Sequence, residues 1–574
     1  MQLASSFKKQ TALLLSTVAL LPLLAFGLFA PFYQTNDDVA MRLLAEGSFA
    51  PGIAPTPFLM HMNIAIGEIL TLAYRALPGW PWYDLLLGAG MLAASAALLF
   101  VWLGLGRPDE LLWGLLFALT LLLPAFVDVQ FSLVGLGCAA AGVALLVRAA
   151  ITPLAGRSRS AHLLAGGGLF LWGALVRFEG AALIALEGAL LAVPLLIGAG
   201  REPGGRARVR QAVLAAAGAG VLAALSVVAN QAAYRHSAGW QQFYEYNFHR
   251  SRLAEYITPE RLTPERMARL EAVVGWSNTD FALFRNWFFA DPEMFSLKKV
   301  RQAEGVFFDG TATKGDLWTA ASLKRGLELS KSLFSETRLA LVVLAAFVIA
   351  RGRGRLIAYF GGAVVLLIAL IAGMTVVLKA PPQRIFWPML LMVAALLTLA
   401  AQRWRRPAHP AAGALLLLIG TCCTLAALWR LHGESAARSA GSALLRRDVA
   451  AARLAGASFF LLHGNAFQYE DYWRPMQVEA VPFPFIGLGV SARTPPVQEF
   501  LRRTHRTDLP LSLCSEEGLV IVGDDYVTAL LTGFVAEHHH RAVRFAPVFK
   551  GARFTAWQCL PAQPPGSAAP PGRS

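Results

Sequence analysis

Long apolar runs separated by short polar segments form the main pattern of this chain. Eleven runs come near the roughly 20 residues with which an α-helix crosses a bilayer. They lie at 11–33, 82–104, 111–127, 131–150, 162–176, 180–198, 212–234, 336–350, 356–378, 385–402 and 411–430. The predicted fold class is a polytopic α-helical membrane protein with about 11 transmembrane helices, outer-face loops and a small C-terminal α/β outer domain. We interpret the first run as a retained span, because it is long for the apolar part of a signal peptide.

The positive charges between these runs predict the topology. With the N-terminus cytoplasmic and the C-terminus outside, inner segments hold sixteen Lys and Arg residues and short outer segments hold five. Cytoplasmic loops of membrane proteins carry such an excess. The five outer residues are Arg42, Arg75, Arg177, Lys379 and Arg384.

The apolar run at 58–77 is ambiguous. If it spanned, every later arginine cluster would face outward, so we expect an interfacial or re-entrant helix on the outer side. His61, Glu68 and Arg75 are spaced seven apart, which predicts that they share one helix face. That face either shows polar groups to water or lines a pocket.

These assignments give the domain organisation. We expect the N-terminus and first span at 1–33, a first outer loop at 34–81, a six-span block at 82–234, a large outer helical loop at 235–335, a four-span block at 336–430, a C-terminal outer α/β domain at 431–560 and a disordered tail at 561–574. In the C-terminal domain we expect strands at Ser458–Leu462 and Leu519–Val522 and a helix at Val497–Thr504.

Composition agrees with the membrane class. The chain is 56% hydrophobic and 15% charged, against about 25% charged in soluble domains. Its net charge of +15 lies largely in the short loops, so we expect no nucleic-acid partner. Cys514 and Cys559 would both lie outside, where disulfides can form; whether they pair stays open. The tract His538–His540 lacks acidic or cysteine partners at ligand spacing, which favours a solvated surface over a metal site.

The first outer loop holds the most informative polar segment, Thr35–Gly47. Asn36 is a good N-cap and Gly47 a good helix stop, with Asp37 and Asp38 in the first turn. Two acids there suit the helix dipole. Alternatively, paired carboxylates at a membrane surface can supply a general base. Arg42, His61 and Glu68 are then candidate substrate-binding residues.

Two arginines lie at predicted outer helix ends, where arginines are few. Arg177 lies at a tight outer turn, and Arg384 follows two prolines. A guanidinium binds phosphate through paired hydrogen bonds. The alternative is that each only reaches the interface from a helix end. Glu187, inside a span, is costly unless paired, and could be a structural partner of Arg177. The aromatics of the second outer loop fit a packed core better than sugar-stacking platforms.

The order of these features resembles the GT-C glycosyltransferase superfamily, which includes oligosaccharyltransferases, protein mannosyltransferases and lipid A aminoarabinose transferases. One span, an Asp-Asp pair opening the first outer loop, a helix, many spans and a C-terminal outer domain carry the resemblance. A group of bacterial polytopic membrane proteins looks similar in further stretches, namely Asn36–Gly47, Trp82-Tyr83, Tyr244–Tyr256, Gly275–Pro292 and Pro381–Pro388. No WWD-type motif is present, which disfavours the oligosaccharyltransferases.

The resemblance implies an enzyme of the plasma membrane. It would move a sugar from a polyprenyl-phosphate donor to a glycan, lipid or protein acceptor on the outer face, with Asp37 or Asp38 as the base. The resemblance also implies that arginines hold the donor phosphate, and Arg177 and Arg384 are the candidates. Donors with one phosphate usually need no metal in these families, so we expect no cofactor, although the two acids could also hold a divalent ion. Two other functions stay open: a transporter or flippase of lipid-linked sugars, and a non-catalytic envelope-assembly protein.

Overall fold

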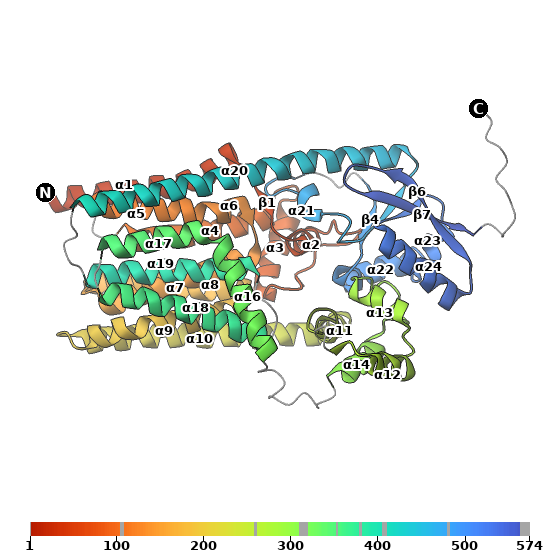
Figure 1. The fold of residues 1–574 in the computed structure, drawn as a ribbon, viewed down its shortest axis with the longest axis horizontal. Coiled ribbons are helices and arrows are strands. Elements are labelled where there is room, and N and C mark those ends of the chain that lie inside the picture. Colours follow the sequence, from red (N-terminus) through yellow and green to blue (C-terminus); the bar gives the residue numbers. More distant parts are fainter. Residues whose placement is uncertain are drawn as a thin grey trace.

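The computed structural model describes residues 2–103, 108–257, 261–308, 320–351, 354–377, 382–404, 410–478 and 483–562. Figure 1 shows a long helix bundle that begins at the N-terminus, and a smaller mixed domain at the other end of the molecule. Strand β1 and helices α2, α3 and α21 lie at the junction between these two parts. The predicted tail at 561–574 falls almost wholly outside the described residues, as does Lys379.

Each predicted span coincides with a helix. Among the described residues, eight helices are long and apolar enough to cross a membrane, or nine if α16 (Ala320–Glu336) and α17, which meet at a 77° bend, count as one span. The bundle helices are α1 (Gln2–Leu28), α4 (Trp82–Trp102), α5 (Pro108–Phe117), the π-helix η1 (Ala118–Leu122), α6 (Leu123–Val127), α7 (Phe131–Ile151), α8 (Gly156–Val176), α9 (Phe178–Gly200), α10 (Gly205–His236), α17 (Arg338–Arg351), α18 (Arg355–Val377), α19 (Gln383–Arg403) and α20 (Pro410–Leu454). The predicted membrane class is confirmed.

Helices α7 and α19 form the centre of the bundle. Within their apolar windows 94% and 83% of residues are buried, whereas the windows of α10 and α20 are 17% and 11% buried. Apolar side chains such as Leu222 and Leu225 are exposed on α10. An apolar helix that is not covered by protein suits a lipid environment.

Glycines bring α7 and α8 into close contact. A Cβ on Gly173 of α8 would lie 2.3 Å from the carbonyl oxygen of Gly135 on α7, and one on Gly142 would lie 2.5 Å from that of Gly166. Small residues allow such close backbone approach between membrane helices. This contact fixes the start of α7 and the end of α8, which both face the site described below.

The first outer loop contains two helices. In α2 (Asn36–Glu46) the N-cap is Thr35, not Asn36 as predicted, while Gly47 ends the helix at φ 80° as expected. Helix α3 (Ile64–Ala76) has 13 residues, too few to span a bilayer, which agrees with the prediction for 58–77. It begins after its N-cap Asn63, so His61 does not share a helix face with Glu68 and Arg75. That prediction was wrong because the capping asparagine starts the helix later.

The second outer loop is helical. It contains α11 (Ala238–Glu255), α12 (Pro264–Val274), α13 (Asn278–Arg285), α14 (Leu297–Phe307) and α16 (Ala320–Glu336). Trp240, Tyr246, Trp276 and Phe288 are each at most 5% exposed, so the prediction of a packed aromatic core is confirmed for these four. Trp287 is half-buried and has a φ of 63°, which is strained for a bulky side chain.

The C-terminal part continues from α20, whose 45 residues run from the bundle into the mixed domain (Figure 1). Its five strands have the order β4-β3-β5-β7-β6, with β3, β4 and β5 parallel and β7 antiparallel to β5 and β6. They are β3 (Phe459–Leu462), β4 (Phe485–Gly487), β5 (Leu519–Gly523), β6 (Val543–Lys550) and β7 (Thr555–Pro561), with α21 (Tyr469–Tyr472), the 3-10 helix η3 (Val490–Arg493), α22 (Pro495–Arg503), α23 (Leu509–Leu513) and α24 (Asp525–His539) between them.

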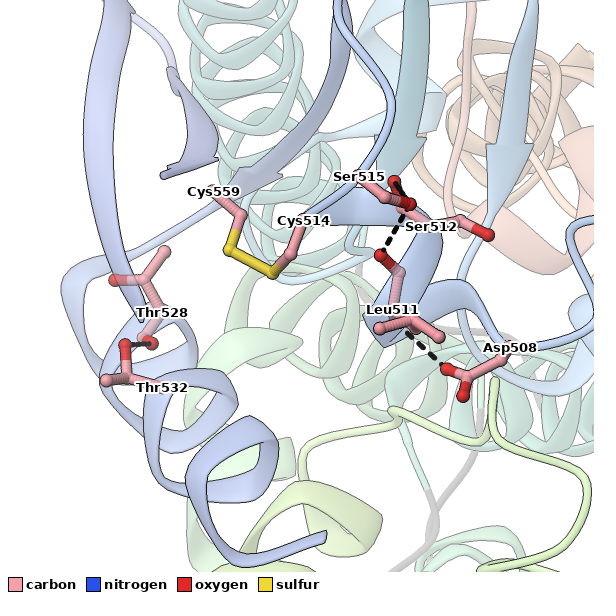
Figure 2. Close-up of a disulfide and its surroundings, with 8 residues drawn as sticks. All are labelled: Asp508, Leu511, Ser512, Cys514, Ser515, Thr528, Thr532 and Cys559. Carbon is pink, nitrogen blue, oxygen red and sulfur yellow. Dashed lines mark hydrogen bonds between the residues drawn. A yellow bond between two sulfur atoms is a disulfide. The ribbon is translucent and has the colours of Figure 1, made fainter. Parts of the chain in front are cut away.

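The predicted strands at Ser458–Leu462 and Leu519–Val522 correspond to β3 and β5, and the helix at Val497–Thr504 corresponds to α22. Cys514 and Cys559, whose pairing the sequence left open, form a disulfide. Figure 2 shows this bridge, which joins the end of α23 to β7 beside α24.

Candidate functional site

Asp38 connects the segment predicted as the first outer loop to neighbouring helices through hydrogen bonds. Its side chain is fully buried. One carboxylate oxygen accepts hydrogen bonds from the Phe131 backbone N–H at 2.9 Å and the Tyr83 hydroxyl at 3.0 Å, and the other accepts one from the Thr35 hydroxyl at 2.9 Å. Burial raises the pKa of Asp38 to about 7, although these donors oppose the rise. Asp38 therefore ties α2 to the starts of α4 and α7.

Asp37, the preceding residue, lies in a different environment. Its side chain is 40% exposed, and one carboxylate oxygen lies 3.9 Å from Nε2 of His61. The imidazole of His61 stacks on Phe131, with ring centroids 5.8 Å apart and planes 8° apart. Burial lowers the pKa of His61, and the Asp37 carboxylate opposes this. Asp37 is thus the carboxylate of the pair that a substrate can reach.

The charges of two arginines affect the pKa of His61. The positive charges of Arg177 and Arg250 both lower the pKa of His61, after burial and against the effect of Asp37. Arg177 is the single residue between α8 and α9, as the predicted tight turn requires. Its guanidinium lies 5.7 Å from the Phe131 ring centroid and 3.5 Å from Glu179. Asp37, His61 and Arg177, three of the predicted site residues, therefore lie near one another.

Arg250 on α11 is the residue that sequence reasoning missed. It is 3% exposed and lies 2.9 Å from Glu255 and 4.9 Å from the ring centroid of the strained Trp287. Asp37 contributes to the electrostatic environment of Arg250. The only signal in the sequence was the aromatic and charged stretch Tyr244–Tyr256, which has no feature that singles out one arginine.

The C-terminal domain adds a further carboxyl group. Burial raises the pKa of Glu470 on α21 to about 7, and Asp37 is among the charges that add to this rise. Arg438 of α20 opposes it and pairs with Asp128 at 2.7 Å. Asp128 lies on β2 (Asp128–Val129), which pairs with β1 (Phe32–Tyr33) just before Asp37. Four distant segments of the chain therefore meet around Asp37.

Three other predicted site residues lie elsewhere. Arg42 is buried; it donates hydrogen bonds to the Tyr33 hydroxyl at 3.2 Å and the Arg474 carbonyl at 3.1 Å, and one to the Gln477 carbonyl. It also lies 3.8 Å from Asp84. These contacts lock α2 to the C-terminal domain. Glu68 is exposed on α3.

Arg384, at the start of α19, is half-buried and lines a separate cleft of about 100 Å³. Gln34, Asp128, Trp387 and Arg430 also line this cleft, whereas Asp37, His61, Arg177 and Arg250 do not. Glu187 of α9 is fully buried, and neither of its carboxylate oxygens has a hydrogen-bond partner among the described residues. The suggested pairing of Glu187 with Arg177 is not present, because Arg177 lies beside Glu179.

The chain is similar to known proteins in structure but not in sequence. No family model matches the chain, and no curated protein matches it in sequence. Among solved structures it is similar to ArnT from Cupriavidus metallidurans bound to undecaprenyl phosphate, with 13% identity, a TM-score of 0.41 and coverage of 95% of this chain and 97% of that one. ArnT in the apo state gives 12% identity, a TM-score of 0.40 and coverage of 96% and 98%.

Proposed function

We propose that this chain is a membrane glycosyltransferase that moves a sugar from a polyprenyl-phosphate donor to a cell-envelope acceptor at the outer face. The observation that carries the proposal is the position of Asp37. Its half-exposed carboxylate lies beside His61, in a polar site that also holds two arginines, at the end of an apolar helix bundle. Such a site combines a base for a hydroxyl with cations for a lipid phosphate.

In this proposal Asp37 is the general base. A hydroxyl is a weak nucleophile at neutral pH, so a carboxylate must take its proton as the sugar is transferred. Asp38 cannot do this without breaking its hydrogen bonds, because it is fully buried and both of its oxygens accept one. Asp38 instead positions Asp37 by fixing the first turn of α2.

Arg177 and Arg250 are proposed to hold the donor phosphate. As the bond to the sugar breaks, negative charge grows on the leaving phosphate, and guanidinium groups stabilise it. Glu179 and Glu255 hold the two arginines in place meanwhile. We propose that the reaction uses no metal at the Asp pair, since the Asp38 carboxylate is buried and already accepts three hydrogen bonds.

The outer location is supported by two independent features. The disulfide lies in the C-terminal domain, and disulfides persist in oxidising compartments. At the opposite end of the bundle, Arg208 and Arg403 both pair with Glu202, among the loop arginines expected on the cytoplasmic side. We therefore place the N-terminus inside and the Asp37 site outside.

The test is a mass-spectrometric profile of envelope glycans and lipid-linked sugars. A deletion strain is compared with strains carrying wild type, Asp37→Asn, Asp38→Asn or the exposed control Glu271→Gln, at matched membrane levels. We expect Asp37→Asn to abolish the product while its lipid-linked donor accumulates, and Asp38→Asn and Glu271→Gln to restore it. Restoration by Asp37→Asn would refute the assignment and favour a transport or assembly function.

A further inference from the structure

We infer that Asp291, Asp508 and His539 form a binding site for a divalent transition metal of the zinc class, which clamps the second outer loop to the C-terminal domain. Their three ligand atoms all lie within 4.8 Å of one another. The sequence analysis found no acidic partners for the tract His538–His540, because the two carboxylates stand 248 and 31 positions before His539.

A ring nitrogen of His539 lacks a hydrogen-bond partner in this cluster. Nε2 of His539 is inaccessible to solvent and has no hydrogen-bond partner among the described residues. It lies 3.6 Å from a carboxylate oxygen of Asp508, which is too far for a hydrogen bond. With metal–ligand bonds of about 2.0–2.1 Å, two tetrahedral ligands lie about 3.4 Å apart. The observed separation therefore matches two ligands of one ion.

Backbone hydrogen bonds orient the two carboxylates. One oxygen of Asp508 accepts a hydrogen bond from the Leu511 N–H at 2.9 Å, at the start of α23 (Figure 2). One oxygen of Asp291 accepts hydrogen bonds from the Glu293 and Met294 N–H groups at 2.8 and 2.7 Å. Each side chain is thus oriented through one oxygen, which leaves its second oxygen for a ligand. Backbone contacts of this kind orient metal ligands.

The neighbouring histidine provides a contrast. His538 forms a similar group with Asp280 and Glu537. However, its Nε2 already bonds Asp280 at 2.8 Å, and Glu537 accepts hydrogen bonds from Ser277 and Thr279 at 2.7 and 2.9 Å. Those polar groups are satisfied, so we assign that group to packing between α13 and α24.

A metal at the first cluster has a structural effect. Asp291 stands four residues after Trp287, whose indole lies against Arg250. An ion that joins Asp291 to α23 and α24 therefore holds this segment of the second outer loop against the C-terminal domain. One oxygen from each carboxylate and one imidazole give three ligands, and water completes a fourth position.

The test uses full-length protein in detergent, purified without a histidine tag and stripped with EDTA. Zn²⁺ is titrated by calorimetry into wild type, His539→Gln, Asp508→Asn and the control His540→Gln, an exposed residue of the same tract. We expect one site per chain, weakened by at least about tenfold in the first two variants, because even outer-shell partners matter that much, and unchanged in His540→Gln.

A second readout separates ligand loss from misfolding. Co²⁺ bound with tetrahedral geometry gives visible absorption bands, which wild type and His540→Gln should show and His539→Gln should lack, while size-exclusion profiles remain the same. If wild type binds Zn²⁺ no more tightly than His539→Gln, or if His540→Gln loses binding equally, the assignment is wrong.

Discussion

At the scale of single residues, the two adjacent acids of α2 have opposite environments. Asp37 is 40% exposed and Asp38 is buried with three hydrogen-bond donors around it. Neighbours in a helix point about 100° apart, so one can face solvent and the other a core. The sequence identified this pair but could not separate its members, because the donors come from residues up to 93 positions away.

The arginines should affect donor binding. Arg177→Ala removes a guanidinium beside Asp37, and hydrogen bonds to charged groups contribute about 1.5–3 kcal/mol. We therefore expect the KM for the lipid-linked donor to rise about ten- to hundredfold, with Arg177→Lys intermediate because an ammonium lacks the paired geometry. Kinetics in detergent micelles measure this. Arg42→Lys, by contrast, should lower stability without a selective effect on donor KM.

The raised pKa of Asp38 makes stability depend on pH. The folded carboxyl binds its proton more tightly than the unfolded one, whose pKa is near 3.8. Raising the pH from about 4 to about 7 therefore lowers the free energy of unfolding, because the buried Asp38 carboxyl loses its proton. This decrease is complete above about pH 7. We expect the melting temperature of wild type to fall relative to Asp38→Asn over this window. A difference that is constant between pH 5 and pH 8 would contradict the assignment.

At the scale of elements, the contact between α7 and α8 fixes the distance between Phe131 and Arg177. The long apolar runs at 131–150 and 162–176 predicted both helices, because length and hydropathy are local properties. The path of α20 was not predicted: the polar residues from Arg430 onward read as the end of a span, whereas the helix continues to Leu454. Strands β6 and β7 were also missed, since their half-exposed residues and Pro547 obscure the alternation.

Glycine substitutions on α8 test this contact. In Gly173→Ala the new Cβ would meet the Gly135 carbonyl at 2.3 Å, so the helices must separate, whereas Gly168 has open space around it. Overpacking typically costs about 1–3 kcal/mol. We expect Gly173→Ala to lower the melting temperature and Gly168→Ala to leave it unchanged. Equal melting temperatures for the two variants would show that the contact is loose.

At the scale of the whole molecule, the C-terminal domain contacts the segment that carries the proposed base, Asp37. The charge of Asp37 adds to the raised pKa of Glu470 on α21, and Arg42 holds α2 to the Arg474 and Gln477 carbonyls. Such contacts between residues more than 400 positions apart depend on the complete fold. The sequence could therefore predict the class of the fold and one side of the site, but not the residues that complete it.

The disulfide should stabilise this domain. Its two cysteines are 45 positions apart, and closing a loop of this size contributes about 2–4 kcal/mol. We expect Cys514→Ser with Cys559→Ser to increase cleavage of the C-terminal domain by added protease in right-side-out vesicles, while the membrane part stays intact. Unchanged cleavage would mean that packing alone holds the domain.

The continuous helix α20 also sets a length scale. Its 45 residues extend about 68 Å at 1.5 Å per residue, against a hydrocarbon thickness of about 30 Å. A continuous helix of this length holds the C-terminal domain at a fixed distance from the lipid. Only part of this length can lie in the lipid, so the remainder of α20 connects the helix bundle rigidly to the C-terminal domain.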